Sequence, residues 1–192
     1  MMKPTKIVGA DGNRHKNDFY PTPPECTIAL LEFLKKYNLI RYGDNVWEPA
    51  CGDGAMVNAM RKKGYDAFGT DITEGYDYLT TDFSKECDWI ITNPPFSLAK
   101  EFIERSLLFK KPFALLLKSQ YWHSARRYEL FENHAPNFVL PLTWRPDFTN
   151  KGNSLLDMMW CVWIYNTQIT YYQPLQRPSA QLLDDDQIQM IF

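Results

Sequence analysis

Short apolar runs alternate with amphipathic stretches along most of this 192-residue chain. Apolar runs bounded by turn residues indicate buried strands, and apolar residues spaced three and four apart indicate helices. The expected strands cover residues 45–50, 65–70, 87–93, 113–119, 137–144 and 155–166. The expected helices cover residues 22–37, 55–64, 97–110 and 124–133. This alternation predicts an α/β fold with a mainly parallel sheet, in which the last two strands can pair antiparallel.

Two segments depart from this rhythm. The stretch from Ile72 to Asp82 is too short for a crossover helix and a strand, so we expect a reduced third unit there. Residues 1–20 are polar and are expected to be loose. No repeat or linker marks a second domain, and we interpret residues 1–192 as a single domain.

The first helix carries start signals of its own. Thr22 is expected to cap it, Pro23 suits its first turn, and Glu25 completes a capping box. Leu30, Leu31, Leu34 and Tyr37 form its expected buried face.

Composition and charge narrow the class of protein. A hydrophobic content of 45% and a charged content of 23% are those of a folded soluble protein. The net charge is −2, so any contact with nucleic acid must come from a local basic patch. Four widely spaced cysteines predict free thiols in a reducing cytosol and no metal site. Neither a signal peptide nor a membrane span is evident, which predicts a cytoplasmic location.

Candidate chemistry begins where the first two expected strands end. The segment EPACGDG, residues 48–54, follows the first strand, and Asp71 follows the second. Ligands of open α/β sheets bind outside the carboxyl ends of the strands. Gly52 and Gly54 allow close approach of the backbone to a ligand, and Asp71 can accept hydrogen bonds from both hydroxyls of a ribose. The carboxylates favour a zwitterionic or cationic ligand, although a glycine turn after a strand is common in itself.

A stronger signal is the segment NPPF, residues 93–96, directly after a buried strand. The side-chain oxygen of Asn93 and the carbonyl of Pro94 can both accept hydrogen bonds from one substrate NH2 group, and the prolines hold these acceptors rigid. Phe96 offers a face to a planar ring. Two such acceptors draw the nitrogen towards tetrahedral geometry and free its lone pair for attack on a methyl sulfonium. The alternative is a rigid proline turn that only ends the strand.

These segments together resemble the amino-methyltransferases, in particular the S-adenosylmethionine-dependent DNA adenine N6-methyltransferases. EPACGDG, Asp71, Thr81-Asp82-Phe83 and NPPF occur in the family's order, preceded by the similar element DFYPTPP, residues 18–24. The resemblance covers nearly the whole chain. It implies a Rossmann-like, seven-stranded, mostly parallel methyltransferase sheet with helices on both faces and an antiparallel final strand. It also implies methyl transfer, without a metal, to the N6 amine of an adenine flipped out of double-stranded DNA.

The resemblance assigns the residues that would bind the cofactor. They are Tyr20, Thr22, Glu48, Pro49, Ala50, Cys51, Gly52, Asp71, Ile72, Asp82, Phe83 and Asn93. Tyr20 and Thr22 would lie near the methionine carboxylate, and Asp71 would bind the ribose. Ile72 would pack on the cofactor's adenine, whose amine would donate to Asp82. The methionine part would lie along Glu48, Cys51 and Gly52. Catalysis would fall to Asn93, Pro94, Pro95 and Phe96.

Recognition of DNA is the clear departure from the family. Its members usually carry a target-recognition domain, and this chain has no room for one of ordinary size; its small size resembles phage or prophage-encoded members. Loops would therefore contact the substrate. The candidate residues are Phe96, Trp122, His123, Arg126, Arg127, Trp144, Arg145 and Lys151. Each alone also fits a solvated charge or a tryptophan at the edge of the core.

Several other functions use the same layout. Methylation of adenine in RNA and of glutamine in proteins both fit an NPP-aromatic motif. Phe96 and the DFYPTPP element favour DNA. Cytosine N4 enzymes usually have Ser where Asn93 stands. A catalytically silent nucleic-acid-binding module of the same fold is the alternative from a different class, and the intact Asn93 and Asp71 argue against it.

Overall fold

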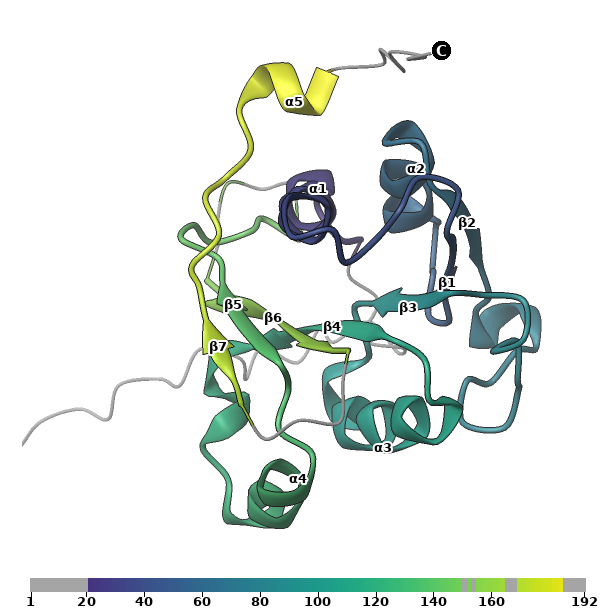
Figure 1. Ribbon diagram of the computed structural model, residues 1–192, viewed down its shortest axis with the longest axis vertical. Coiled ribbons are helices and arrows are strands. Elements are labelled where there is room, and N and C mark those ends of the chain that lie inside the picture. Colours follow the sequence, from purple (N-terminus) through teal and green to yellow (C-terminus); the bar gives the residue numbers. More distant parts are fainter. Residues whose placement is uncertain (1–20, 150–151, 153–154, 165–168, 185–192) are drawn as a thin grey trace, which may run out of the picture.

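A computed structural model describes residues 21–149, 152, 155–164 and 169–184 of the chain. In this part, seven strands form one sheet in the order β2-β1-β3-β4-β6-β5-β7 (Figure 1). The strands are β1 (Asn45–Glu48), β2 (Asp66–Gly69), β3 (Trp89–Thr92), β4 (Phe113–Lys118), β5 (Phe138–Pro141), β6 (Met158–Trp163) and β7 (Tyr171–Tyr172). The predicted α/β fold is confirmed.

The direction of the strands also follows the prediction. β1 pairs in parallel with β2 and β3, and β3 pairs in parallel with β4. β6 is antiparallel to both of its neighbours, β4 and β5. The sheet is thus mostly parallel, and its reversed strand is the one expected within residues 155–166.

The identity of the seventh strand differs from the expectation. The reduced third unit forms no strand; it contains a 3₁₀ turn at Ile72–Glu74. β7 instead supplies the seventh strand, pairing in parallel with the outer side of β5. Its two residues, Tyr171 and Tyr172, are both exposed, so they leave no alternating pattern in the sequence.

Helices cover both faces of the sheet, as predicted. α1 (Pro24–Lys36) and α2 (Ala55–Lys62) lie on one face, and α3 (Ala99–Phe109) and α4 (Tyr128–Asn133) lie on the other (Figure 1). Successive strand residues divide between the two cores because side chains alternate along a strand. Val46 packs with α1 and α2, whereas its neighbour Trp47 packs on the α3 side.

The first helix begins differently from the prediction. It starts at Pro24, its N-cap is Pro23, and no side chain caps it. The expected cap by Thr22 and the capping box with Glu25 are therefore wrong. The two prolines fix the backbone of the first turn and lack two of the N–H groups that a cap would satisfy. Thr22 and Glu25 are thus available for contacts with distant parts of the chain.

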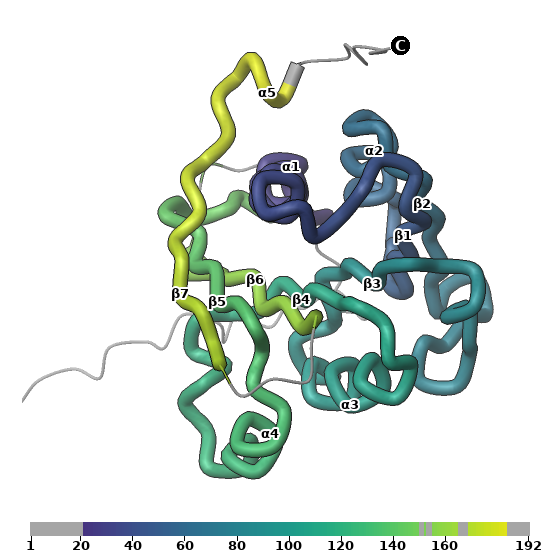
Figure 2. The backbone as a smooth tube through the Cα atoms, viewed as in Figure 1, coloured from purple at the N-terminus to yellow at the C-terminus, as the bar shows by residue number. Residues whose placement is uncertain are grey.

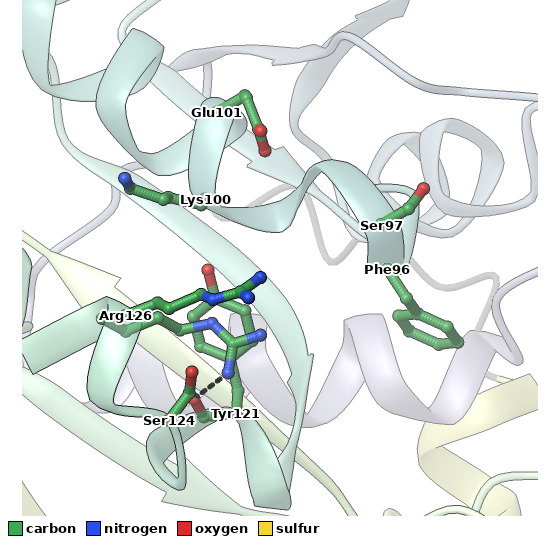
Figure 3. Close-up of a pocket in the computed structure, with 8 residues that line it drawn as sticks. Phe96, Ser97, Lys100, Glu101, Tyr121, Ser124 and Arg126 are labelled. Carbon is green, nitrogen blue, oxygen red and sulfur yellow. Dashed lines mark hydrogen bonds between the residues drawn. The ribbon is translucent and has the colours of Figure 1, made fainter.

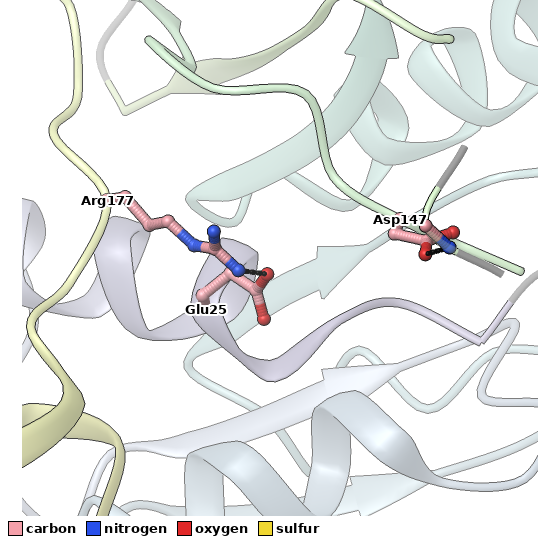
Figure 4. A network of polar contacts seen from close by, with 4 residues as sticks. Glu25, Asp147 and Arg177 are labelled. Carbon is pink, nitrogen blue, oxygen red and sulfur yellow. Dashed lines mark hydrogen bonds and ion pairs between the residues drawn. The ribbon is translucent and has the colours of Figure 1, made fainter. Parts of the chain in front are cut away.

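The C-terminal segment returns across the first helix. After β7 the chain passes beside α1 and ends, within the described residues, in the short helix α5 (Ala180–Asp184) (Figure 2). Arg177 forms an ion pair of 2.9 Å with Glu25 of α1 (Figure 4). The ammonium of Lys63 donates a hydrogen bond to the carbonyl of Leu182. The C-terminal segment thereby stabilises the start of α1, in addition to the packing of α1 in the core.

None of the helices in the described part of the chain has both the length and the apolar character that crossing a membrane requires.

Candidate active site

The candidate residues gather where parallel strands end at one edge of the sheet. Glu48 at the end of β1 is in register with Gly69 at the end of β2, and Trp47 is in register with Ile90 of β3. The backbone continues this pairing beyond the strands. Thr70 N–H donates to the Glu48 carbonyl at 3.0 Å, and Cys51 N–H donates to the Thr70 carbonyl at 3.1 Å. The loop after β1 is therefore held against the end of β2.

This loop approaches β2 so closely that only glycine fits at position 69. A Cβ placed on Gly69 would lie 2.6 Å from Cys51 Cβ, 2.7 Å from its Sγ and 3.1 Å from Val57 Cγ2. Within the loop, Gly52 and Gly54 have φ values of 53° and 80°, the left-handed region that glycine adopts without strain. The predicted need for glycine in this loop is consistent with that backbone. Gly69 was not among the residues predicted from the sequence, and its only sequence signal is its place at the end of a strand.

Asp71 connects the ends of β1 and β2. One of its carboxyl oxygens accepts the Gly52 N–H at 2.9 Å, and the other accepts both the N–H and the hydroxyl of Thr73, at 2.9 and 2.7 Å. Burial raises the pKa of Asp71, but these hydrogen bonds outweigh it and hold the pKa below its usual value. Asp71 is thus a fixed anion. The oxygen facing Gly52 still has a lone pair for a ligand hydroxyl, and Ile72 beside it is 64% exposed.

Glu48 has the opposite electrostatic state. Burial raises the pKa of its carboxyl well above the usual value, a hydrogen bond from the Val57 backbone lowers it, and the charges of Asp53 and Asp71 raise it further. One of its oxygens, Oε2, is buried without a hydrogen-bond partner in the described residues. A buried, unpaired carboxyl favours its neutral form until a cation approaches. Glu48 is therefore able to accept a positively charged ligand group.

Asn93 presents a second unpaired acceptor. Its amide nitrogen donates to the hydroxyl of Thr22 at 3.1 Å, which fixes the orientation of the amide. Its amide oxygen is shielded from solvent and has no hydrogen-bond partner among the described residues. Leaving a buried acceptor unpaired is unfavourable, by about 1–3 kcal/mol. The Asn93 oxygen can therefore accept a hydrogen bond from a donor group of a ligand.

Phe96 lies next to this acceptor on a short turn. The turn is closed by the Leu98 N–H, which donates to the Pro95 carbonyl at 2.9 Å. The ammonium of Lys118, at the end of β4, lies 4.0 Å from the centroid of the Phe96 ring. This cation–π contact holds the ring in place. Lys118 was not among the residues predicted from the sequence, although a charged residue at the carboxyl end of a buried strand is a signal that indicates such a site.

The remaining predicted cofactor residues differ in their surroundings. Pro49 is buried and Ala50 is half-buried within the loop after β1. Asp82 is exposed, and its carboxylate accepts the Ser84 N–H at 2.8 Å. Phe83 packs edge-on against Trp47 in the aromatic core on the face of the sheet that α3 covers. Tyr20 lies outside the described residues.

The predicted substrate-contacting residues do not form one group. Trp122 packs on Phe131, and its indole N–H donates to Met159 Sδ. Trp144 packs against the core on the α1 side. Lys151 lies outside the described residues. His123 is exposed, Arg145 forms an exposed ion pair with Asp157, and Arg126 and Arg127 line a pocket beside Phe96.

A metal-binding arrangement is not found in the part of the chain that the structure describes, where no three His, Cys, Asp or Glu side chains are suitably grouped.

Solved structures with a similar fold are known. No protein-family model and no curated protein sequence matches the chain. Among solved structures, it is similar to a type I restriction-modification methyltransferase subunit from Streptococcus thermophilus, with a TM-score of 0.61 and 14% identity over 85% of this chain and 51% of that one. A modification subunit of a putative type I restriction enzyme from Vibrio vulnificus is similar with a TM-score of 0.55 and 15% identity, over 89% of this chain and 49% of that one.

A putative class I S-adenosylmethionine-dependent methyltransferase from Listeria monocytogenes gives a TM-score of 0.55 and 13% identity over 79% of this chain and 65% of that one. The chain thus spans about half the length of the two restriction-modification subunits. At these identities the likeness establishes the fold alone, which this chain shares with the three structures.

The tight packing at Gly69 gives a testable prediction. Gly69→Ala should destabilise the protein by about 1–3 kcal/mol, since the added methyl group overlaps Cys51. Combining it with Cys51→Gly removes the two nearest atoms, so the double variant should be more stable than the sum of the single effects implies, by about 1 kcal/mol or more. Chemical denaturation of the four proteins measures this coupling. Additive effects would show that the loop does not rest on Gly69.

Proposed function

We propose that this protein transfers a methyl group from S-adenosylmethionine to the N6 amine of an adenine in DNA. The observation that carries the proposal is Asn93, whose amide is oriented by Thr22 and whose oxygen is left as a buried acceptor without a partner. An exocyclic amine supplies the missing donor. The methyltransferase fold of the structural neighbours supports the same reaction class.

The residues at the ends of β1 and β2 fit S-adenosylmethionine. The unpaired Oε2 of Glu48 suits the α-ammonium of its methionine part, and anionic Asp71 suits the ribose hydroxyls. Exposed Ile72 offers an apolar surface to the adenine ring. When bound, S-adenosylmethionine supplies a methyl group on a positively charged sulfur that leaves as a neutral thioether.

The NPPF segment performs the remaining task, which is to prepare the amine. The oxygen of Asn93 and the carbonyl of Pro94 accept its two N–H groups, so the nitrogen becomes tetrahedral and its lone pair turns towards the methyl group. The Asn93 oxygen is shielded in the free protein, so the incoming base must uncover it. Phe96, fixed by Lys118, stacks with the base ring. The two acceptors would stay hydrogen-bonded to the nitrogen while it carries the positive charge of methylation, and one of its protons would then pass to water.

DNA is the favoured substrate for two reasons. Two of the structural neighbours are a methyltransferase subunit of a type I restriction-modification system and a modification subunit of a putative type I restriction enzyme. The NPPF motif itself resembles that of adenine N6 enzymes. Because a paired adenine cannot bring its amine to Asn93, the base must leave the helix.

Parallel assays test this proposal. Purified protein is incubated with methyl-labelled S-adenosylmethionine and with duplex DNA, RNA or protein, and the labelled product is digested and identified. Label in DNA as N6-methyladenine is the expected result. Label only in RNA, only in protein glutamine, or only in N4-methylcytosine would contradict it, as would the absence of transfer to any substrate.

Substitution of Asn93 should slow the methyl-transfer step far more than it weakens cofactor binding. Asn93→Ala is expected to lower the single-turnover rate by roughly 100- to 1000-fold, the usual effect of removing one preorganised polar partner in the transition state. It should alter the affinity for S-adenosylmethionine far less. Asn133→Ala, on the exposed end of α4, is the matched control and should keep wild-type activity. An Asn93→Ala protein with a wild-type melting temperature and near-wild-type turnover would remove Asn93 from the chemistry.

Glu48 should make cofactor binding depend on pH. Its raised pKa favours the protonated carboxyl in the free protein, and an adjacent ammonium favours its ionised form. Binding should therefore release a proton, and affinity should rise with pH up to the pKa of Glu48 in the free protein. Calorimetry in buffers of different ionisation enthalpy measures this release. Glu48→Gln should abolish Glu48's share of it and weaken binding. Equal proton release by wild type and Glu48→Gln would contradict this role.

A further inference from the structure

A charged pocket lies next to the Phe96 ring, on the α3 side of the NPPF turn. Its volume is about 290 Å³, and Figure 3 shows its lining side chains. They include Phe96, Lys100, Glu101, Tyr121, Arg126 and Arg127. Three of these are cationic and one is anionic, so the pocket is positive within a chain of net charge −2. The volume is many times what a single water molecule requires, so the pocket can admit a larger polar group.

The two arginines of the pocket are not neutralised by the protein. Neither Arg126 nor Arg127 forms an ion pair with a described residue, whereas Lys100 pairs with Glu104 on α3 at 3.5 Å. Arg127 is rigidly placed: its guanidinium donates to the Tyr121 carbonyl at 2.8 Å and lies 3.9 Å from the centroid of the Tyr121 ring. Arg126 is exposed and extends across the pocket towards α3 (Figure 3).

Tyr121 adds an independent sign of a ligand. Its side chain is only 7% exposed, and its phenol oxygen is buried without a hydrogen bond of good geometry to a described residue. Burial raises the pKa of Tyr121, and the nearby Arg127 guanidinium lowers it against this effect. Figure 3 shows the ring lying behind Arg126 in the pocket wall. A buried hydroxyl without a partner is unfavourable. An acceptor entering the pocket would satisfy it, together with the free donors of the two guanidinium groups.

A phosphate is the acceptor that best matches these donors. Guanidinium groups bind phosphate oxygens through paired N–H groups, and a tyrosine hydroxyl donates to the same oxygens. Phe96 belongs both to this pocket and to the turn that follows Asn93. A nucleotide whose base stacks on Phe96 therefore carries its own backbone phosphate within reach of the pocket.

We propose that Arg126, Arg127 and the Tyr121 hydroxyl bind the backbone phosphate next to the flipped nucleotide. This inference rests on the proposed function and extends it, because it names the groups that would hold the target strand. Phosphate contacts fix the position of a nucleic acid without reading its sequence. The pocket would thus position the target strand while loops elsewhere read the bases.

The salt dependence of DNA binding tests the inference. Affinity for a short mixed-sequence duplex is measured across a range of salt concentrations, with S-adenosylmethionine affinity measured beside it. Arg126→Gln should reduce the slope of log affinity against log salt by about 0.9, the value of one lost phosphate contact. Tyr121→Phe, which keeps the ring under Arg127, should weaken binding roughly tenfold with little change in slope, since it removes an uncharged donor. Neither variant should alter cofactor affinity.

Arg41→Gln is the matched control. Arg41 is exposed just before β1, at the opposite edge of the sheet, and its loss should leave the slope unchanged. If wild type binds and methylates DNA while Arg126→Gln keeps the wild-type slope, the phosphate site is wrong and the proposed function stands. An equal loss of slope in Arg41→Gln would also overturn the site, since binding would then follow net charge alone. A wild type that methylates no DNA overturns the proposed function itself.

Discussion

The parallel pairing of β1 with both β2 and β3 is the constraint on which the rest of this structure depends. It brings three carboxyl ends to one edge, so that residues far apart in sequence meet there. Backbone hydrogen bonds extend the pairing into the loops, from Thr70 to Glu48 and from Cys51 to Thr70. The close contact of Cys51 with Gly69 and the hydrogen bond from Gly52 to Asp71 then fix the first loop. A change in register of either strand would separate these groups.

The polar groups at this edge differ in whether the protein itself satisfies their hydrogen bonds. Asp71 accepts three hydrogen bonds from the protein and remains ionised, as a fixed anion should. Glu48, Asn93 and, beyond the edge, Tyr121 each keep a buried polar atom without a partner among the described residues. Buried polar groups are rarely left unpaired in folded proteins. Ligands that supply the missing donors and acceptors would satisfy these three atoms, whereas the equally unpaired hydroxyl of Thr92, at the end of β3, has no such role.

The sequence predicted the α/β fold, the mostly parallel sheet with its reversed strand, and the strand ends that carry the candidate residues, because these follow from local apolar periodicity and motif order. It did not predict β7, whose two exposed tyrosines carry no pattern. It assigned Thr22 to a helix cap, although the hydroxyl accepts from Asn93, 71 residues away. The close approach at Gly69 and the contact of Lys118 with Phe96 likewise depend on packing between distant segments. Local sequence marks these residues only by their places at strand ends and does not identify their partners.

We propose that Thr22 orients the Asn93 amide so that its oxygen faces the substrate amine. The most direct measurement compares single-turnover methylation by Thr22→Ser and Thr22→Val, with melting temperature and cofactor affinity measured for both. Thr22→Ser keeps the hydroxyl and should retain most of the wild-type rate. Thr22→Val has nearly the same shape but cannot accept from the amide, and its rate should fall roughly tenfold or more, since one buried hydrogen bond is lost. A folded, cofactor-binding Thr22→Val protein with the wild-type rate would contradict the claim.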